Sequence, residues 1–223
     1  PETAMVYWGT DEVDGNLHVE EVVEIADCHD VPVLVDNSNN LPPKRHLHRY
    51  IDAGAALVAF SGGKGIRGPQ GSGILAGRRE LIEAVGMQSA PTQGIGRVAK
   101  VSKEEVVGLV TALELFAAQD EEELLTEQRR RAQMLAHMVD GYPCSSADVM
   151  FPDHAGRIYP TVMLNVGNAR TAADVIEELR TGDPAVAAMN FADDPKVVRF
   201  DVRLCEEWEI EAIAGRLKEV LSA

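Results

Sequence analysis

The sequence has few cysteines, a shortage of positive charge and no long apolar run, and each shortage excludes a class of protein. The three cysteines, Cys28, Cys144 and Cys205, lie far apart and form no CxxC pair, which argues against a disulfide framework and against a zinc site. No uninterrupted apolar run is long enough to span a bilayer, and the first residues lack a basic stretch followed by an apolar one. We therefore expect a cytoplasmic protein with reduced thiols, no bound metal and no membrane partner.

The shortage of positive charge bears on the choice of partner. Lysine and arginine number 21 against 36 aspartates and glutamates, which gives a formal net charge of −15 at pH 7. Such an excess of negative charge repels phosphate backbones unless a local basic patch overrides it. Nucleic acid is therefore not expected among the partners.

What is present is a chain of 223 residues with 45% hydrophobic composition, enough for one or two units with a sizeable core. Over the first hundred residues, short apolar runs alternate with amphipathic stretches, as in βαβ units. Continuous runs of Val, Leu and Ala indicate strands of a parallel sheet that is covered on both faces. The predicted strands cover residues 4–8, 31–35 and 56–60, and the predicted helices cover 19–28 and 43–53.

Helical spacing of apolar residues dominates from 102 to about 139, and Gly141 and Pro143 end this pattern. Beyond it the sequence predicts strands near 161–166, 186–191 and 197–202, a helix opened by Thr171 and a last helix over 206–221. We therefore expect three parts: a large domain over 1–101, a long connecting helix over 102–140 and a small α+β domain over 141–223.

A glycine-rich segment over residues 61–73 follows directly on the third predicted strand and contains six glycines and two cations. A phosphate-binding P-loop requires Ser or Thr after its lysine, whereas Gly65 follows Lys64. Gly63, Gly65 and Gly68 match GxGxxG, but a proline and a strand-like run follow where a dinucleotide fold requires a helix. The third interpretation is a Schiff-base lysine, in which Lys64 leaves a strand end and binds an aldehyde cofactor.

Asp36 supports the third interpretation. It ends the predicted strand over 31–35, so its carboxylate is expected at the same edge of the sheet as Lys64. A carboxylate there can pair with a protonated pyridine nitrogen. Taken alone, Asp36 would be interpreted as a turn residue and Lys64 as a solvent-facing side chain. Because they follow successive predicted strands, the two residues together favour the interpretation of Lys64 as a Schiff-base lysine that binds a cofactor.

Two histidines, His46 and His48, raise the question of a metal pair. Residues two apart on a helix point in different directions, so they are poorly placed to share one ion. We expect surface or interface histidines at these positions.

Several motifs together carry a resemblance to a known family. Val35-Asp36, the following Leu41-Pro42-Pro43 and the whole segment 60–73 resemble the pyridoxal phosphate family of selenocysteine synthase (seryl-tRNA selenium transferase) and the glucosaminate-phosphate ammonia-lyase-like enzymes. The similarity continues through Gly94-Ile95-Gly96-Arg97 and residues 101–105, and it ends with residues 182–184 and Arg203. It covers nearly the whole chain, and the string over 61–70 is more similar to the lyase-like branch.

The resemblance implies an α/β fold of the aspartate-aminotransferase-like type (type I), with a parallel-rich sheet in a partial large domain. It also implies pyridoxal 5'-phosphate as cofactor, Lys64 as catalytic and Schiff-base lysine and Asp36 as partner of the pyridinium. Ser61 would contact the cofactor phosphate, Arg67 a phosphate or substrate anion, and Arg203 the substrate carboxylate. A role in the turn for Ser61, and surface ion pairs for the two arginines, stay open as alternatives.

The leading functional hypothesis is a pyridoxal-phosphate lyase that catalyses α,β-elimination of ammonia from a small anionic amino acid or amino sugar acid. The alternatives are an L-seryl-tRNA(Sec) selenium transferase, which the net charge disfavours, and a non-catalytic truncated subunit. The third hypothesis arises because Pro1 corresponds to a position well inside the family's large domain. Besides a small-molecule substrate, we expect a homo-oligomer and a companion chain that carries the missing amino-terminal part.

Overall fold

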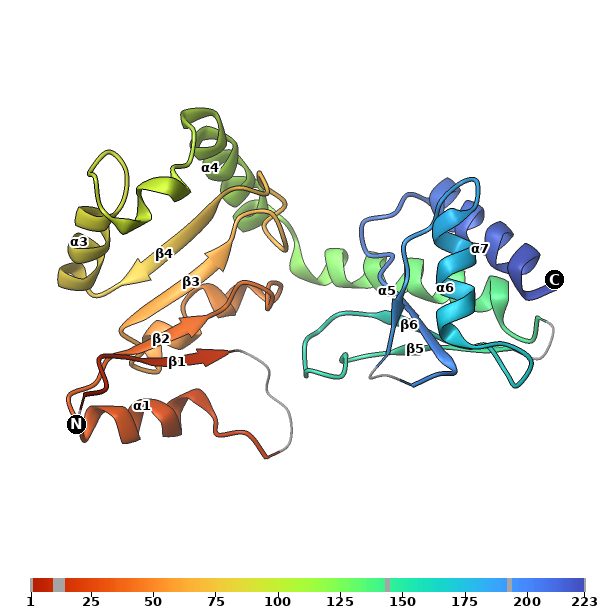
Figure 1. Ribbon diagram of the computed structural model, residues 1–223, viewed down its shortest axis with the longest axis horizontal. Helices are drawn as coiled ribbons and strands as arrows, with labels where there is room; N and C mark the ends of the chain where they lie inside the picture. The colour runs from red at the N-terminus through yellow and green to blue at the C-terminus, as the bar shows by residue number, and fades with distance from the viewer. Residues whose placement is uncertain (1, 10–14, 143–144, 192–193, 223) are drawn as a thin grey trace. The chain divides into compact units, whose positions relative to one another are not determined.

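The computed structural model describes residues 2–9, 15–142, 145–191 and 194–222, which belong to two units over 1–121 and 122–223 (Figure 1). Pro143 and Cys144, to which the sequence analysis gave roles, lie outside the described residues. The three-part division expected from the sequence stays a prediction. Within the described residues, no helix has the length and apolar character needed to cross a membrane.

The first unit is built on a four-stranded sheet in the order β1-β2-β3-β4 (Figure 1). The first three strands are parallel and β4 runs antiparallel to β3, which confirms a parallel-rich sheet. Two buried strands were predicted within two residues of their observed bounds, because continuous apolar runs identify them. The strands are β1 (Val6–Gly9), β2 (Val33–Asp36), β3 (Leu57–Ser61) and β4 (Gly73–Gly77).

The helical elements up to Asp52 connect the three parallel strands, and those after Gly77 follow the last strand of the sheet. The helix expected over 43–53 is instead a 3-10 turn followed by one short α-helix, because the His48 amide donates to the carbonyl of Arg45, three residues back. The helical elements are α1 (Val19–Asp27), η1 (Lys44–Leu47), α2 (Arg49–Asp52), α3 (Arg79–Gln88), η2 (Ile95–Ala99) and α4 (Lys103–Ala118).

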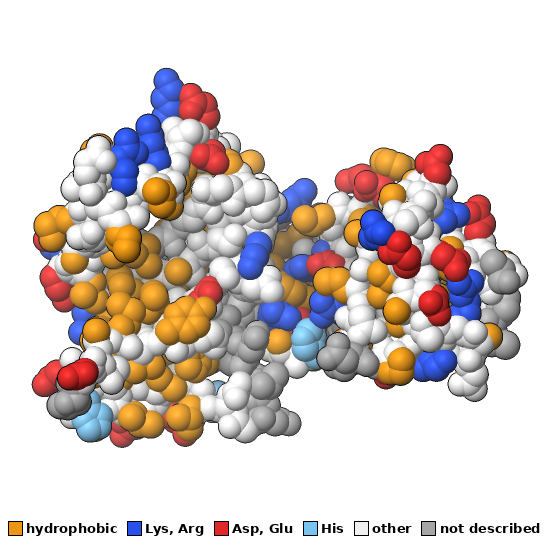
Figure 2. Space-filling view, viewed as in Figure 1, with side chains coloured by type: hydrophobic (Ala, Val, Ile, Leu, Met, Phe, Trp, Pro, Cys, Tyr) orange, Lys and Arg blue, Asp and Glu red, His pale blue; other side chains and the backbone are white. Residues whose placement is uncertain are grey.

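The two faces of the sheet differ in burial. Val33, Val35, Val58 and Phe60 point to one face and form a core with side chains of α1, α2 and α4. On the other face Tyr7 is 65% exposed and Leu34 beside it is only partly buried, while Leu57 on the next strand is buried, so this face is less covered than expected. Figure 2 shows hydrophobic side chains exposed over the strands of this unit.

The long helix expected over 102–140 is two helices, α4 (Lys103–Ala118) and α5 (Glu121–Val139). The break is stabilised from far along the chain, because Nζ of Lys44 donates to the carbonyl of Ala117 at 2.8 Å and to that of Gln119. A cation at the carboxyl end of α4 satisfies carbonyls that the helix itself leaves without partners.

The second unit is a small α+β fold, as predicted, with antiparallel strands in the order β5-β6-β8-β7 and a core shared with three helices. The hydroxyl of Thr171 accepts a hydrogen bond from the backbone amide of Asp174, so Thr171 caps the start of α6 as expected. Val186 does not join the strand predicted near it, because its amide donates to the carbonyl of Leu179 on α6. The elements are α5, β5 (Ser146–Met150), β6 (Thr161–Asn165), α6 (Ala172–Thr181), β7 (Met189–Asn190), β8 (Val197–Phe200) and α7 (Glu207–Ser222).

Candidate active site

Asp36 is the last residue of β2 and receives two hydrogen bonds. The hydroxyl of Tyr7 donates to its Oδ2 at 2.7 Å, and the backbone amide of Ser38 donates to its Oδ1 at 2.9 Å. Tyr7 is in reach because Gly9 pairs with Asp36, so the residue two before Gly9 faces the same side of the sheet. The sequence alone does not indicate Tyr7, since the proximity of Tyr7 to Asp36 depends on β1 lying beside β2.

These contacts determine the charge of the carboxyl group. Burial alone would raise the pKa of Asp36, but the hydrogen bonds from Tyr7 and Ser38, together with the positive charge of Lys64, outweigh it. The pKa therefore lies below its ordinary value, and Asp36 is an anion at neutral pH.

Lys64 lies three residues beyond the end of β3 and its side chain is exposed. Its Nζ is 3.5 Å from the hydroxyl of Ser38, the residue whose amide binds Asp36. The fold thus brings Lys64 and Asp36 to the same edge of the sheet, where the sequence placed them. Their catalytic roles stay predictions.

The backbone around Lys64 is held by close packing of glycines. A Cβ on Gly63 would stand 2.6 Å from Cα of Gln70, and one on Gly65 would overlap the carbonyl oxygen of Leu41. The side-chain amide of Gln70 also donates to the carbonyl of Gly63 at 3.0 Å. The loop therefore needs glycine on both sides of the lysine.

Two further predicted residues lie in the same unit with their polar groups available. Within the part of the chain that the structure describes, the Ser61 hydroxyl makes no hydrogen bond and Arg67 makes no ion pair. The turn is stabilised instead by Ser72, whose hydroxyl donates a hydrogen bond to the carbonyl of Pro69 at 2.6 Å. Arg67 lines a hollow of about 430 Å³ together with side chains of α4. It can therefore receive an anion without breaking an existing ion pair.

Arg203 belongs to the second unit and is already paired. Its Nε and Nη2 donate to the two carboxylate oxygens of Asp201 at 2.8 and 2.6 Å, and its guanidinium lies 3.5 Å from the ring centre of Tyr159. Burial would raise the pKa of Asp201, but the hydrogen bonds and charge of Arg203 hold it below its ordinary value. A substrate carboxylate would have to displace Asp201, so the predicted role of Arg203 stays a prediction.

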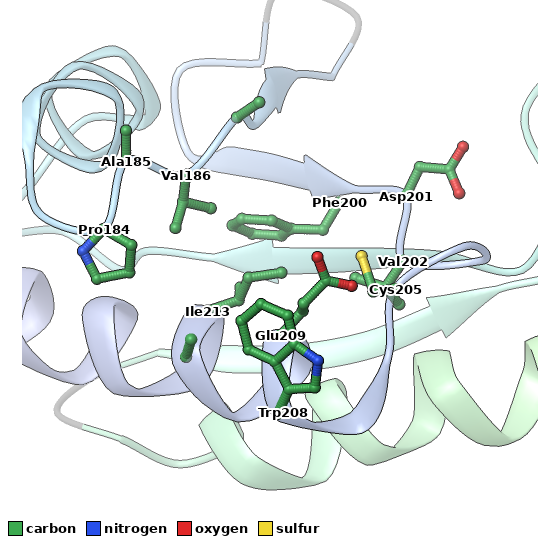
Figure 3. A pocket seen from close by; sticks show the side chains of 12 residues that line it. Pro184, Ala185, Val186, Phe200, Asp201, Val202, Cys205, Trp208, Glu209 and Ile213 are labelled. Atoms are coloured by element: carbon green, nitrogen blue, oxygen red, sulfur yellow. The ribbon is translucent and has the colours of Figure 1, made fainter.

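A second hollow of about 430 Å³ lies between the end of β8 and α7, and Asp201, the partner of Arg203, is among its lining residues (Figure 3). Phe200, Trp208 and Ile213 make its walls apolar, and Figure 3 shows their side chains around the opening. The carboxylate of Glu209 accepts the amide of Glu206 at 2.7 Å and so caps α7. The Glu209 carboxylate therefore already has a hydrogen-bond partner at the start of the helix.

Two of the three cysteines lie within the described residues. Cys28 and Cys205 are free thiols. Burial, followed by the charge of Glu209, raises the pKa of Cys205, which keeps this thiol protonated.

The expectation of surface histidines is wrong for His46 and right for His48. His46 is buried, with Nδ1 2.9 Å from the carbonyl oxygen of Asn40, and its own carbonyl accepts the side-chain amide of Asn37 at 3.1 Å. The hydroxyl of Tyr50 binds Asn40 at 3.0 Å, which completes a buried network beneath the loop that follows Asp36. No group of three or more His, Cys, Asp or Glu side chains suited to a metal occurs among the described residues.

Comparison with known proteins places the chain in a family. A family model described as L-seryl-tRNA selenium transferase (SelA) matches residues 13–140. A 5'-C-glycyluridine monooxygenase-decarboxylase from Streptomyces sp. is 34% identical over 91% of this chain and 49% of its own length. A D-glucosaminate-6-phosphate ammonia lyase from Salmonella typhimurium is 30% identical over 92% of this chain and 53% of its own length. The chain spans about half the length of the curated relatives it matches.

Solved structures agree with this placement. A D-glucosaminate-6-phosphate ammonia-lyase has a TM-score of 0.76 at 28% identity, covering 98% of this chain and 57% of the other. A serine palmitoyltransferase from S. paucimobilis with bound PLP shares the fold at a TM-score of 0.59 and 15% identity, covering 97% of this chain and 54% of the other. The predicted family and the type I fold are confirmed. The chain belongs to the L-seryl-tRNA selenium transferase family.

Proposed function

We propose that the protein is a pyridoxal 5'-phosphate-dependent lyase that releases ammonia from a small anionic amino acid or amino sugar acid. The observation that carries the proposal is the pair formed by Lys64 and Asp36 at one edge of the sheet. An amine and a carboxylate kept anionic by Tyr7 and Ser38 are the two groups that this cofactor requires of a protein.

The described residues fit the cofactor. Lys64 would hold it covalently, and Asp36 would face its pyridine nitrogen. The unpartnered hydroxyl of Ser61 and the guanidinium of Arg67 are suited to its phosphate or to an anionic substrate. When bound, the cofactor supplies an electron sink for the charge left at the substrate's α-carbon after a proton is removed.

The protein's own residues would then perform three tasks. The free amine of Lys64 takes the proton from the α-carbon as general base. Asp36 stays deprotonated and stabilises positive charge on the ring nitrogen, while Tyr7 fixes the direction of its carboxylate. The packed glycines on either side of Lys64 limit the positions that the amine can adopt.

The choice of a lyase draws support from the relatives named ammonia lyase in both sequence and structure comparisons. The selenium transferase is the second candidate, favoured by the family description and disfavoured by the net charge of −15. A homo-oligomer and a cytoplasmic location remain parts of the proposal.

The test supplies the protein with pyridoxal 5'-phosphate and measures ammonia and 2-oxo acid release from D-glucosaminate 6-phosphate, serine and related amino acids. We expect release from an anionic substrate by the natural protein and none by a Lys64→Ala variant. Visible absorbance by the bound cofactor without ammonia from any substrate would reject the lyase. Absence of bound cofactor would favour the non-catalytic subunit.

A further inference from the structure

The turn that follows β2 is held by buried polar side chains on both sides of Ser38. Asn37 is 1% exposed, and its side-chain amide donates to the carbonyl of His46 at 3.1 Å. Asn40 is also buried, and its side-chain amide donates to the hydroxyl of Tyr50 at 3.0 Å. Buried polar groups that have partners make the segment that carries them rigid. The turn is therefore fixed at both ends, with Ser38 between them.

The same turn is attached to the strand that leads to Lys64. The backbone amide of Asn37 donates to the carbonyl of Ala59 on β3 at 2.9 Å. Lys64 lies three residues beyond the end of this strand. The position of Ser38 relative to the lysine loop is thus determined by the backbone of the sheet.

Ser38 contacts both functional groups of the candidate site. Its backbone amide donates to Oδ1 of Asp36 at 2.9 Å, and its hydroxyl oxygen lies 3.5 Å from Nζ of Lys64. Among the described residues, no other hydrogen-bond acceptor contacts this amine. A hydroxyl has one proton and two lone pairs, so it can accept an N–H of lysine while it donates its own proton to a carboxylate.

The ionisation of Asp36 indicates the direction in which the hydroxyl acts. Burial raises the pKa of Asp36, whereas the hydroxyl of Tyr7 and both polar groups of Ser38 lower it. A hydroxyl lowers the pKa of a carboxyl group by donating to its ionised form. Ser38 therefore presents its proton to Asp36, which leaves its lone pairs for the amine of Lys64.

A contact of this kind restricts a flexible side chain. A lysine carries about 2 kcal/mol of rotamer entropy, and Lys64 is exposed, so its free amine would otherwise sample many positions. A general base has to lie within hydrogen-bond reach of the proton that it removes. Hydrogen bonds in a site without substrate are often long and shorten when substrate binds, which fits the separation of 3.5 Å.

We propose that Ser38 positions the free amine of Lys64 by accepting one of its N–H groups while it donates to Asp36. This role rests on the proposed function, in which Lys64 binds the cofactor and its free amine acts as general base. Ser38 is a positioning residue, because it acts through Lys64 and not on the substrate. The buried network beneath the turn then has a task, which is to keep Ser38 in place.

The first test measures the carboxyl group of Asp36 by carbon-13 NMR during a pH titration and requires no cofactor. Ser38→Ala removes the hydroxyl and should raise the pKa of Asp36, whereas Ser38→Thr keeps a hydroxyl and should leave the pKa unchanged. Ser89→Ala is the matched control, because the Ser89 hydroxyl donates to the carbonyl of Val85 at the end of α3. It should leave the pKa of Asp36 unchanged. Circular dichroism checks that each variant is folded.

The second test measures how fast the visible absorbance of bound pyridoxal 5'-phosphate appears after mixing. The lysine nitrogen attacks the aldehyde carbon, a C=N bond forms and the aldehyde oxygen leaves as water, so the rate depends on where the free amine lies. Ser38→Ala should slow the reaction by roughly fivefold, the effect of losing one hydrogen bond, and should reach the same final absorbance. Ser38→Thr and Ser89→Ala should react at the rate of the natural protein.

The results separate the role of Ser38 from the role of Lys64. If the natural protein acquires no visible absorbance, Lys64 does not bind the cofactor, and both the proposed function and the role of Ser38 are wrong. If Ser38→Ala reacts as fast as the natural protein, Lys64 binds the cofactor without help from Ser38, and only the inference about Ser38 is overturned. An equal slowing in Ser38→Ala and Ser38→Thr would also overturn it, because the effect would then not depend on the hydroxyl.

Discussion

The hydroxyl of Tyr7 on β1 donates a 2.7 Å hydrogen bond to Oδ2 of Asp36 on the neighbouring β2. This bond favours the charged form of the carboxyl group and helps to hold its pKa below the ordinary value against the effect of burial. A strand with no evident chemistry in the sequence thus contributes to the electrostatics of the site.

Removing this bond should weaken the fold in a pH-dependent way. Because the pKa of Asp36 is lower in the folded protein, its ionised form contributes stability above the ordinary pKa of about 3.9, and this is lost as the pH falls. Tyr7→Phe should lower the free energy of unfolding by about 1 kcal/mol at pH 7. Urea unfolding at pH 7 and at successively lower pH measures the difference, which should shrink towards zero in acid.

Tyr142→Phe is the control for this prediction, because the hydroxyl of Tyr142 binds Ser222 rather than a carboxylate. Its effect on unfolding should not depend on the ionisation of a carboxyl group. A Tyr7→Phe effect that is as large in acid as at pH 7 would show that the hydroxyl does not act through ionised Asp36.

Neutralising Asp36 should separate cofactor binding from catalysis. Asp36→Asn should keep the cofactor's visible absorbance yet reduce turnover by roughly a hundredfold, since an amide does not stabilise positive charge on the ring nitrogen. Asp52→Asn, on the exposed surface of α2, should leave both unchanged. Full turnover by the Asp36 variant with cofactor bound would remove this residue from the site.

Close packing beside Lys64 gives a prediction for stability. A methyl group on Gly65 would overlap the Leu41 carbonyl, so Gly65→Ala should destabilise the protein by about 1–3 kcal/mol. Gly86→Ala, in helix α3, meets no atom within 4 Å and should stabilise by about 0.5–1 kcal/mol. Thermal unfolding should show a lower melting temperature for Gly65→Ala and a higher one for Gly86→Ala than for the natural protein. Equal shifts in the two variants would mean that glycine is not sterically required at position 65.

The acidic charge predicts weak interaction with tRNA. At physiological salt the net charge of −15 opposes binding, although screening limits this effect beyond about 8 Å. A salt titration of tRNA binding should therefore show no specific complex. Tight binding with a steep salt dependence would favour the selenium transferase over the lyase.

The sequence predicted the buried strands and the edge shared by Asp36 and Lys64, because apolar runs locate parallel strands whose carboxyl ends meet. It did not predict Tyr7, since the order of strands in a sheet is a tertiary property. The sequence also did not predict the break between α4 and α5, because Lys44, which binds the end of α4, lies more than 70 residues away in the chain. Local periodicity continues across this break and contains no sign of such a contact.

The position of the cofactor on the chain can be measured directly. The protein is incubated with pyridoxal 5'-phosphate, reduced with borohydride and digested, and the peptides are mapped by mass spectrometry. If Lys64 holds the cofactor, we expect a pyridoxyl adduct on Lys64 that disappears in a folded Lys64→Ala variant. An adduct on another lysine, such as Lys44 or Lys100, or an unchanged adduct in the variant, would contradict it.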